Sequence, residues 1–546
     1  MPVRVPYGAF ALALLLSAGC GDGKYSPQSV GRVLGVDSAA LHSAIATRIG
    51  SEDRPAWVTT SRWQKVRMAY ERFGNSPLWL EQRGVQERAT ALLEAIRRAP
   101  DHALDTAAYP VSAIERVVDA KRLTDSASAG TLADADVLLT SAYVAYAADM
   151  IAGQVDPKTV SQAWYIPTTP AELDSAIIRG IELADMRASL AAMAPQGAEY
   201  EALKTAYARY RRVAAAGGWP TIEQNRDSAT AAALHARLAA EFEFDATEAA
   251  RAVDSTVDAG FFDNRHMNRP ARDEHISELV RELQRRHGIE PSGRLNDATL
   301  AALNVSAADR AQQVGANLER HRWLPRQLGN RYIYVNVPSF VLTAYDSGGQ
   351  PALEMKVVVG EEYEGKVTPV FSDSMEVVVF RPYWNVTPQI QREEIGPKVA
   401  RDPGYLARNN MEYWSDKGVT RIRQKPGEKN SLGLVKFLFP NNFNIYLHDT
   451  PAKALFQQSD RAASHGCIRV EKPAELAEWV LGWPPEKVQE WMHAERDNRG
   501  VRVPNKIPVY IVYFTVYTRD GELYFGGDVY GRDEKLKEAV RTVAGT

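Results

Sequence analysis

The first half of the chain shows a helical pattern of apolar and polar positions. Between residues 63 and 219, apolar residues recur three and four positions apart, as at Leu92 and Ile96 ahead of Pro100. This spacing puts the apolar side chains on one face of an α-helix, and a proline shortly afterwards ends such a helix. The pattern predicts a helical region over residues 56–265, with its apolar stripes as ordinary helix core.

In the second half of the chain the pattern changes to the alternation of β-strands. Residues 332–337 and 375–380 alternate in this way, and residues 347–349, Ser-Gly-Gly, form a turn signal. We therefore predict a mostly-β domain over residues 320–546. Within it, residues 382–435 interrupt the alternation and are rich in Pro, Gly and aromatic residues, which is typical of a long functional insertion.

A small helical group is predicted between these two regions, over residues 266–306. One helix ends at Gly288, and Asn296 or Asp297 is placed to cap the next helix. Residues 221–265 are mixed, and their run rich in Ala, Asp and Glu predicts an insertion or a pair of surface helices. We assign no function to that stretch. The fold class that follows is multidomain α+β.

The N-terminus has the pattern of an export signal. Arg4 supplies positive charge ahead of an apolar run at residues 9–16, which is too short for the roughly 20 residues that span a bilayer. We predict a signal peptide over residues 1–19 and a polar tether over residues 20–55.

Composition narrows the choice of partners and cofactors. The chain has 546 residues, 45% of them hydrophobic and 24% charged, which is ordinary for several globular domains. A net charge of −3 and no basic stripe argue against a nucleic-acid partner. Two cysteines without clustered His/Cys spacing predict no disulfide and no metal, and we expect no other cofactor.

The candidate chemistry centres on Ser464–Arg469, with the sequence Ser-His-Gly-Cys-Ile-Arg. Cys467 stands nineteen residues after His448. A thiol attacks best as a thiolate, and its unperturbed pKa of about 8.5 leaves it mostly protonated at neutral pH. An imidazole within hydrogen-bond reach can take that proton, so the pair predicts a nucleophile with its general base. The alternative is a buried cysteine that acts as a small hydrophobe.

Gly466 is expected to shape the backbone beside the nucleophile. Glycine permits a tight turn and lets a substrate carbonyl approach the main chain. The amides of Gly466 and Cys467 would then face an oxyanion, a contribution of about 3 kcal/mol per donor in acyl transfer. We predict that His465 and Gly466 together form the loop and the oxyanion site.

The run from His448 to Arg469 resembles the signature of the L,D-transpeptidase catalytic domain of the YkuD type. That signature has a His, a gap of mid-teens length, Ser or Thr with His-Gly-Cys, an apolar residue, and Asn or Arg. Residues 73–79 and 217–220 are similar to the helical scaffold of the large YcbB-type L,D-transpeptidases. Residues 266–306 resemble a three-helix peptidoglycan-binding domain, which either binds peptidoglycan or serves as a spacer.

The resemblance implies an exported enzyme that crosslinks peptidoglycan. Cys467 would attack the third-residue carbonyl of a tetrapeptide stem, expel the terminal D-Ala, and pass the acyl group to an amine of another stem as a 3→3 crosslink. His448 would act as general base and acid, and carbapenems would acylate Cys467. Substrate contacts are expected at Ser464, Tyr446, Arg469 and Trp384.

Two of these contacts have a structural alternative. Arg469 either orders the loop or pairs with a substrate carboxylate, and the alternative to both is an ordinary structural ion pair. Trp384 either lines a substrate groove or packs within the insertion over residues 382–435, which caps the active site in the large family members.

Cys20 resembles the lipidated cysteine of a bacterial lipoprotein signal. Small residues precede it, although Leu16 stands four positions before the cysteine and the pattern prefers three. Cleavage by the ordinary signal peptidase after Gly19 is the alternative, and both processes export the protein. We favour lipidation, which would tether the protein to a membrane in the periplasm of a Gram-negative bacterium.

The sequence leaves other functions open. The same thioester can pass to water, as in an L,D-carboxypeptidase, or to a lysine of an outer-membrane protein. A non-catalytic wall-binding lipoprotein is an alternative of a different class, against which the intact Cys467 and His448 argue. The predicted partners are peptidoglycan stem peptides and glycan strands.

Overall fold

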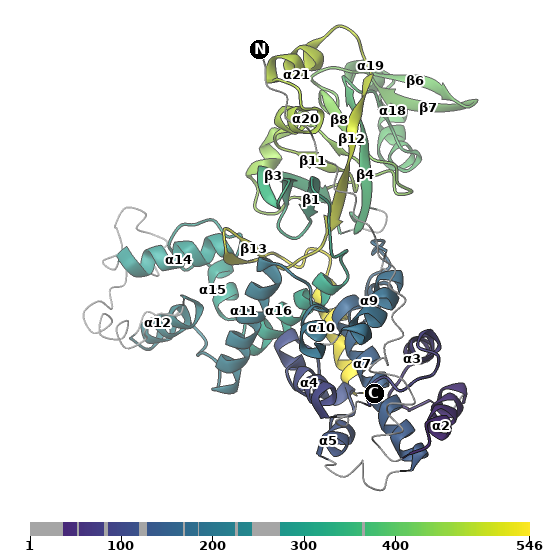
Figure 1. The fold of residues 1–546 in the computed structure, drawn as a ribbon. Coiled ribbons are helices and arrows are strands. Elements are labelled where there is room, and N and C mark those ends of the chain that lie inside the picture. The colour runs from purple at the N-terminus through teal and green to yellow at the C-terminus, as the bar shows by residue number, and fades with distance from the viewer. Residues whose placement is uncertain are drawn as a thin grey trace, which may run out of the picture. The chain divides into compact units, whose positions relative to one another are not determined.

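The computed structural model describes residues 36–51, 54–80, 86–119, 128–167, 170–183, 185–223, 228–242, 274–362 and 366–545. The predicted signal peptide, Cys20 and much of the predicted tether lie outside these ranges. The chain forms two compact units: one combines residues up to 95 with 109–146 and 177–189, and the other holds the remainder. The multidomain α+β class is confirmed, because helices fill the N-terminal region and the C-terminal region is mostly β (Figure 1).

The first unit is organised around α7 (Ala129–Ala152). Its buried Asp136 accepts hydrogen bonds from the Tyr70 hydroxyl at 2.6 Å and from the amides of Leu78 and Trp79 at 3.0 and 2.9 Å. These bonds fix the loop that follows α3 (Thr60–Arg72). The neighbouring α-helices in the chain are α2 (Ser38–Gly50), α4 (Gln86–Arg97), α5 (Val111–Asp119), α8 (Pro157–Val160), α9 (Pro170–Glu182) and α10 (Met186–Ala191).

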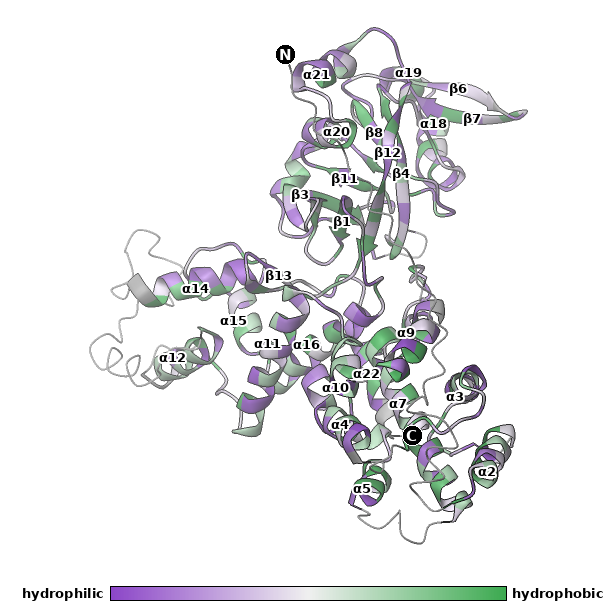
Figure 2. Ribbon diagram, viewed as in Figure 1, coloured by the Kyte–Doolittle hydropathy of each residue, from purple (hydrophilic) through white to green (hydrophobic). Residues whose placement is uncertain are grey.

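Among the described residues, α7 is the one helix long and apolar enough to cross a membrane by length and composition. Its apolar character is visible in Figure 2. However, 89% of its most apolar window is buried inside the protein, as in the core helix of a soluble domain.

A small helical group in the second unit is built from α12 (Ser228–Phe242), α14 (Glu274–Arg286) and α15 (Asp297–Leu303), which share one apolar core. Asn296 caps α15 by accepting the Thr299 amide at 2.8 Å, as predicted. The core thus includes α12, which lies ahead of the predicted boundary at residue 266. Sequence spacing gave no sign of this contact, because a long stretch of chain separates α12 from α14.

Three further helices of the second unit pack together: α11 (Ala198–Ala215), α16 (Ala307–Arg322) and α22 (Arg532–Gly545). A buried ion pair of 2.6 Å joins Arg320 to Asp533 at the start of α22. The hairpin of β13 (Val516–Arg519) and β14 (Glu522–Phe525) adds a ring contact, in which Phe525 stacks on His287 with 4.9 Å between ring centroids.

The region predicted to be mostly β is a sheet closed on itself. Its strand order is β10-β3-β11-β9-β8-β4-β12-β1-β2, and β2 also pairs with β3, so eight strands form a ring without free edges. The strands are β1 (Tyr332–Asn336), β2 (Val341–Asp346), β3 (Gln350–Gly360), β4 (Phe371–Phe380), β8 (Val435–Leu438), β9 (Leu447–His448), β10 (Ala462–Ser464), β11 (Ile468–Val470) and β12 (Arg499–Val512).

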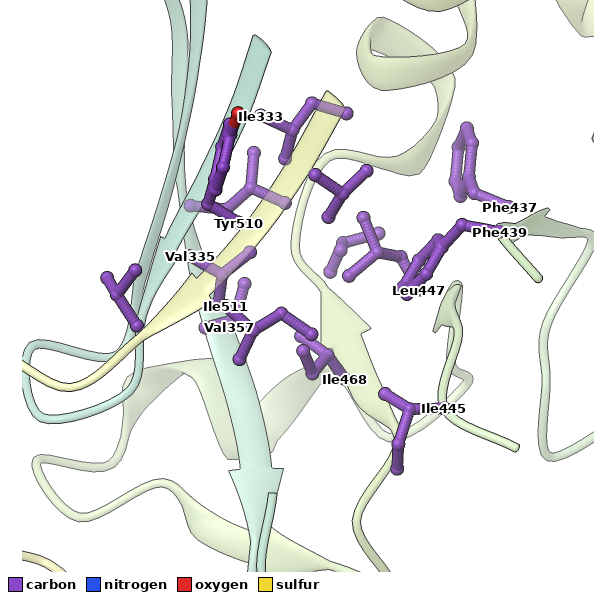
Figure 3. Close-up of a cluster of buried hydrophobic side chains, with 14 of the residues drawn as sticks. Ile333, Val335, Val357, Phe437, Phe439, Ile445, Leu447, Ile468, Tyr510 and Ile511 are labelled. Carbon is purple, nitrogen blue, oxygen red and sulfur yellow. The ribbon is translucent and has the colours of Figure 1, made fainter. Parts of the chain in front are cut away.

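The inside of this barrel is filled by the alternate side chains that point inward. Figure 3 shows Ile333 and Val335 of β1, Leu447 of β9 and Ile468 of β11 meeting in this core, and all four are fully buried. Residues on the outward face of β9 and β11 are therefore available for another role. Two short helices, α20 (Pro473–Leu481) and α21 (Pro485–His493), follow β11.

The insertion within the predicted span 382–435 has a small core of its own. It contains β5 (Trp384–Asn385), β6 (Met411–Asp416) and β7 (Val419–Gln424) in a three-stranded sheet. Short helical turns complete it: α17 (Pro388–Ile390), α18 (Gly396–Arg401) and α19 (Tyr405–Arg408), with a π-turn over Gln391–Ile395 between the first two.

Candidate active site

The barrel register brings the predicted nucleophile and base to one face of the sheet. β11 and β9 run parallel, with Ile468 opposite Leu447 and Arg469 opposite His448. Because Ile468 and Leu447 point into the core, their neighbours Cys467 and His448 lie on the outward face. Residues nineteen apart in sequence thus sit on adjacent strands.

A row of three charged or titratable residues crosses this face. His448 is opposite Arg469 on β11 and opposite Lys436 on β8. Adjacent strands are about 4.8 Å apart, so Lys436, His448 and Arg469 form a row with the imidazole at its centre. Cys467 lies beside Tyr446. Both residues stand two positions along their strands from that row, which corresponds to a distance of about 6.6 Å. Sequence analysis missed Lys436, although its outward position among Val435, Phe437 and Phe439 follows from alternation.

Cys467 is a free, half-buried cysteine. Its thiol donates a hydrogen bond to the backbone oxygen of Asn444, with 3.5 Å between Sγ and that oxygen. Burial raises the pKa of the thiol to about 11, although Tyr446 and the cations Arg469 and Lys436 act in the opposite direction. The thiol is therefore protonated at neutral pH and needs a base to become a nucleophile.

His448 is held as a neutral imidazole. It is 4% exposed, and its Nδ1 lies 2.5 Å from the backbone oxygen of Asp449. A carbonyl only accepts, so Nδ1 carries the proton and Nε2 is left with a lone pair. Burial is the main reason that the His448 pKa is lowered to about 3; the positive charges of Arg469 and Lys436 act in the same direction, and the hydrogen bond to Asp449 acts against them. The residue is thus a base over nearly the whole pH range.

Asp449 anchors the end of β9, a role that sequence analysis did not assign. Its carboxylate accepts hydrogen bonds from the backbone amides of Leu434 and Thr450, at 2.8 and 2.7 Å. It also forms an ion pair with Lys453 at 2.7 Å. A Cβ at Gly433 would lie 2.1 Å from this carboxylate, so glycine is required there. These bonds fix the backbone oxygen that orients His448.

Ser464 shapes the nucleophile loop from within. Its hydroxyl donates to the Cys467 oxygen at 2.6 Å and accepts the Gly466 amide at 3.2 Å. The side chain is buried and both of these hydrogen bonds stay within the loop, which favours a structural role, while the substrate contact of Ser464 stays a prediction. Ser464 thus engages the Gly466 amide, one of the two expected oxyanion donors, and the assignment of the pair stays a prediction. The Cys467 amide makes no hydrogen bond among the described residues.

Gly466 adopts φ +107°, as its predicted turn requires. Thr368 fixes this turn by donating to the Gly466 oxygen at 2.9 Å while accepting the Gly360 amide at 2.9 Å. Tyr530 donates to the Gly360 oxygen at 2.8 Å and completes the support. No sequence spacing pointed to Thr368 or Tyr530, because both reach the loop from distant segments.

His465 points to the insertion. Its Nε2 bonds the carboxylate of Glu394, which lies in the π-turn of the insertion. Trp384 packs against the apolar core of that insertion, together with Tyr405. This packing agrees with the structural alternative for Trp384, and its substrate contact stays a prediction. It also gives His465 a link to the insertion that the sequence did not reveal.

One exposed aromatic residue from the N-terminal half reaches the catalytic region. Trp164 forms a parallel bridge with Val370, and the neighbouring Tyr165 packs on Phe443 with 4.3 Å between ring centroids. Tyr165 remains 45% exposed. Phe443 directly precedes Asn444, whose backbone oxygen accepts the hydrogen bond from the Cys467 thiol. Sequence analysis assigned no chemistry to this segment.

No cluster of three or more His, Cys, Asp or Glu residues suited to a metal ion occurs in the described ranges. The chemistry offered by this face is that of a thiol, a neutral imidazole and two cations.

Comparison with known families identifies two domains. Residues 330–511, which hold nearly the whole barrel and the nucleophile loop, match the family model described as L,D-transpeptidase catalytic domain. Residues 64–206 match the family model described as Scaffold domain. The resemblance to L,D-transpeptidases with a helical scaffold is thereby confirmed.

A curated relative also carries the name of this family. The chain is 32% identical over 248 residues to a protein of Haemophilus influenzae named "Putative L,D-transpeptidase", an alignment that covers 42% of this chain and 49% of the relative. The chain thus spans about half the length of the curated relative that it matches.

Proposed function

We propose that the protein forms 3→3 crosslinks between peptidoglycan stem peptides through a thioester on Cys467. The observation that carries this proposal is the neutral His448, whose Nδ1–H is held by the Asp449 oxygen, on the same sheet face as a free thiol. An L,D-transpeptidase domain supplies the class of substrate, peptidoglycan stems. The acyl donor is a tetrapeptide stem, and the acceptor is an amine of a second stem.

Cys467 and His448 can carry out both the acylation and the transfer step of this reaction. Nε2 of His448 takes the Cys467 proton while Sγ forms a bond to the third-residue carbonyl carbon. Collapse of the tetrahedral intermediate breaks the bond to the terminal D-Ala, whose amine leaves with the proton from His448. The acceptor amine then attacks the thioester, gives a proton to His448, and releases Sγ, which recovers its proton.

The choice of acceptor is the point on which the alternatives differ. The Glu394–His465 contact holds part of the insertion against the nucleophile loop. A covered thioester is shielded from bulk water, and a bound acceptor gains from proximity. Transfer to an amine is therefore the outcome that we propose over hydrolysis.

The muropeptide composition of cells tests this function. Cells that express the protein should contain 3→3 crosslinked dimers that are missing from cells without the gene and from cells that express Cys467→Ser. An increase in tripeptides without new dimers would instead indicate an L,D-carboxypeptidase. Muropeptides carrying residues of another protein would indicate protein attachment.

The acylation rate should be independent of pH over a wide range. With a His448 pKa of about 3 and a Cys467 pKa of about 11, both groups are neutral between these values. Below its pKa His448 is protonated and cannot act as a base, so the rate should fall only below about pH 4. Stopped-flow acylation by a β-lactam across pH 4 to 9 measures this, and an acidic limb near pH 6.5 would contradict it.

The predicted lipid on Cys20, the periplasmic location and the binding of peptidoglycan by the small helical group remain proposals from the sequence. They concern the attachment of the protein to the envelope, not the chemistry of Cys467.

A further inference from the structure

Two cations on the catalytic face have no anionic partner. Lys436 and Arg469 are half-buried, and among the described residues neither forms an ion pair with a carboxylate within 4.0 Å. Glu361 acts on Arg469 only at longer range, and it is paired with Lys366 at 3.3 Å. Burial lowers the pKa of Lys436. A partly desolvated cation without a partner is costly, which favours a functional anion at this place.

The register defines where that anion would lie. Lys436 and Arg469 face each other across His448, two strand spacings or about 10 Å apart. The Lys436 Nζ leans over the Tyr446 ring, 5.8 Å from its centroid, and so toward the Cys467 side of the row. Two long side chains can converge on one carboxylate placed above the imidazole.

The proposed reaction places a carboxylate of the donor stem at about the distance that separates this row from Cys467. The row lies about 6.6 Å along the strands from Cys467, whose Sγ attacks the carbonyl. The leaving residue carries its amine next to that carbonyl and its carboxylate one carbon further. If His448 protonates the leaving amine, the carboxylate falls near His448, between the two cations.

We propose that Lys436 and Arg469 form a subsite for the free carboxylate at the C-terminus of the donor stem. This inference rests on the proposed function for the identity of the ligand. Lys436 selects donors that end in a carboxylate next to the scissile bond, and it fixes the leaving amine under His448. The bound carboxylate also offsets the two positive charges that weaken His448 as a base, so the base is strongest when the donor is in place.

Two small alkylating reagents test the subsite independently of transpeptidation. N-iodoacetylglycine and N-iodoacetylglycinamide both alkylate Cys467, and only the first carries a carboxylate, at about the distance from Sγ that the carboxylate of a leaving residue would have. The ratio of their rate constants should fall about tenfold in Lys436→Met, because a charge-assisted contact is lost. Lys436→Arg should keep the ratio. Lys506→Met, which removes a surface lysine paired with Glu376, is the matched control and should leave the ratio unchanged.

An unchanged ratio in Lys436→Met would overturn the subsite. An equal fall in both rates would also overturn it, since Lys436 would then act on the thiol and not on a carboxylate. The unmodified protein provides a test that needs no variant. A tetrapeptide stem with a C-terminal carboxamide should show a KM about tenfold above that of the free acid.

Equal KM values for acid and amide would contradict the subsite even if every variant misfolded. The two proposals can also fail separately. If the alkylation ratio behaves as expected and no stem peptide reacts, the subsite stands and the proposed function fails.

Discussion

Replacing Cys467 with serine is expected to abolish covalent capture of an acyl donor. The serine hydroxyl is a far weaker nucleophile than the thiol, and His448 is poised for a group of thiol acidity. We expect a loss of at least about 10³-fold, as in other enzymes that lose their nucleophile. Intact-mass spectrometry after incubation with a carbapenem should show one adduct on the wild type and none on Cys467→Ser.

The second cysteine of the sequence provides the matched control. Cys20→Ser should acquire the same adduct at the same rate as the wild type. An adduct on Cys467→Ser, or its loss in Cys20→Ser, would show that Cys467 is not the acylated residue.

Replacing His448 with alanine should lower the acylation rate by about 10²- to 10⁴-fold, the usual contribution of a general base. The effect is large because burial keeps the Cys467 pKa at about 11, so few thiols ionise without help at neutral pH. Single-turnover acylation, with thermal unfolding as a check on the fold, measures the loss.

The variant His465→Ala is the control that isolates the role of His448 as general base. His465 bonds Glu394 of the insertion and has no place in the row of Lys436, His448 and Arg469. We expect its rate of acylation to stay well above that of His448→Ala. The reverse order would mean that the two histidines had been assigned the wrong way round.

The main features of the site could be predicted because they are local in sequence. The alternation around Leu447 and Ile468 fixes which neighbours point outward, and the Ser-His-Gly-Cys string places the nucleophile directly before a core residue. Even so, the engagement of the Gly466 amide by Ser464 was not predicted. The hydrogen bond from the Gly466 amide to Ser464 depends on loop geometry, which residue types alone do not determine.

Features that depend on contacts between distant segments were not accessible. Lys436 faces His448 only because β8 pairs with β9 in one particular register. Thr368 reaches Gly466 from almost a hundred residues away, and Tyr165 approaches Phe443 from the N-terminal half of the chain. Pattern and composition carry no information about such pairings, which are set by the closure of the barrel and by packing.

The products formed by the purified protein from a disaccharide-tetrapeptide test the central claim most directly. Chromatography with tandem mass spectrometry separates 3→3 linked dimers from tripeptide and follows the D-Ala released with each. We predict dimers in excess of tripeptide for the wild type and neither product for Cys467→Ser. Tripeptide as the dominant product at saturating acceptor would make the protein a carboxypeptidase and would contradict transfer of the acyl group to a second stem.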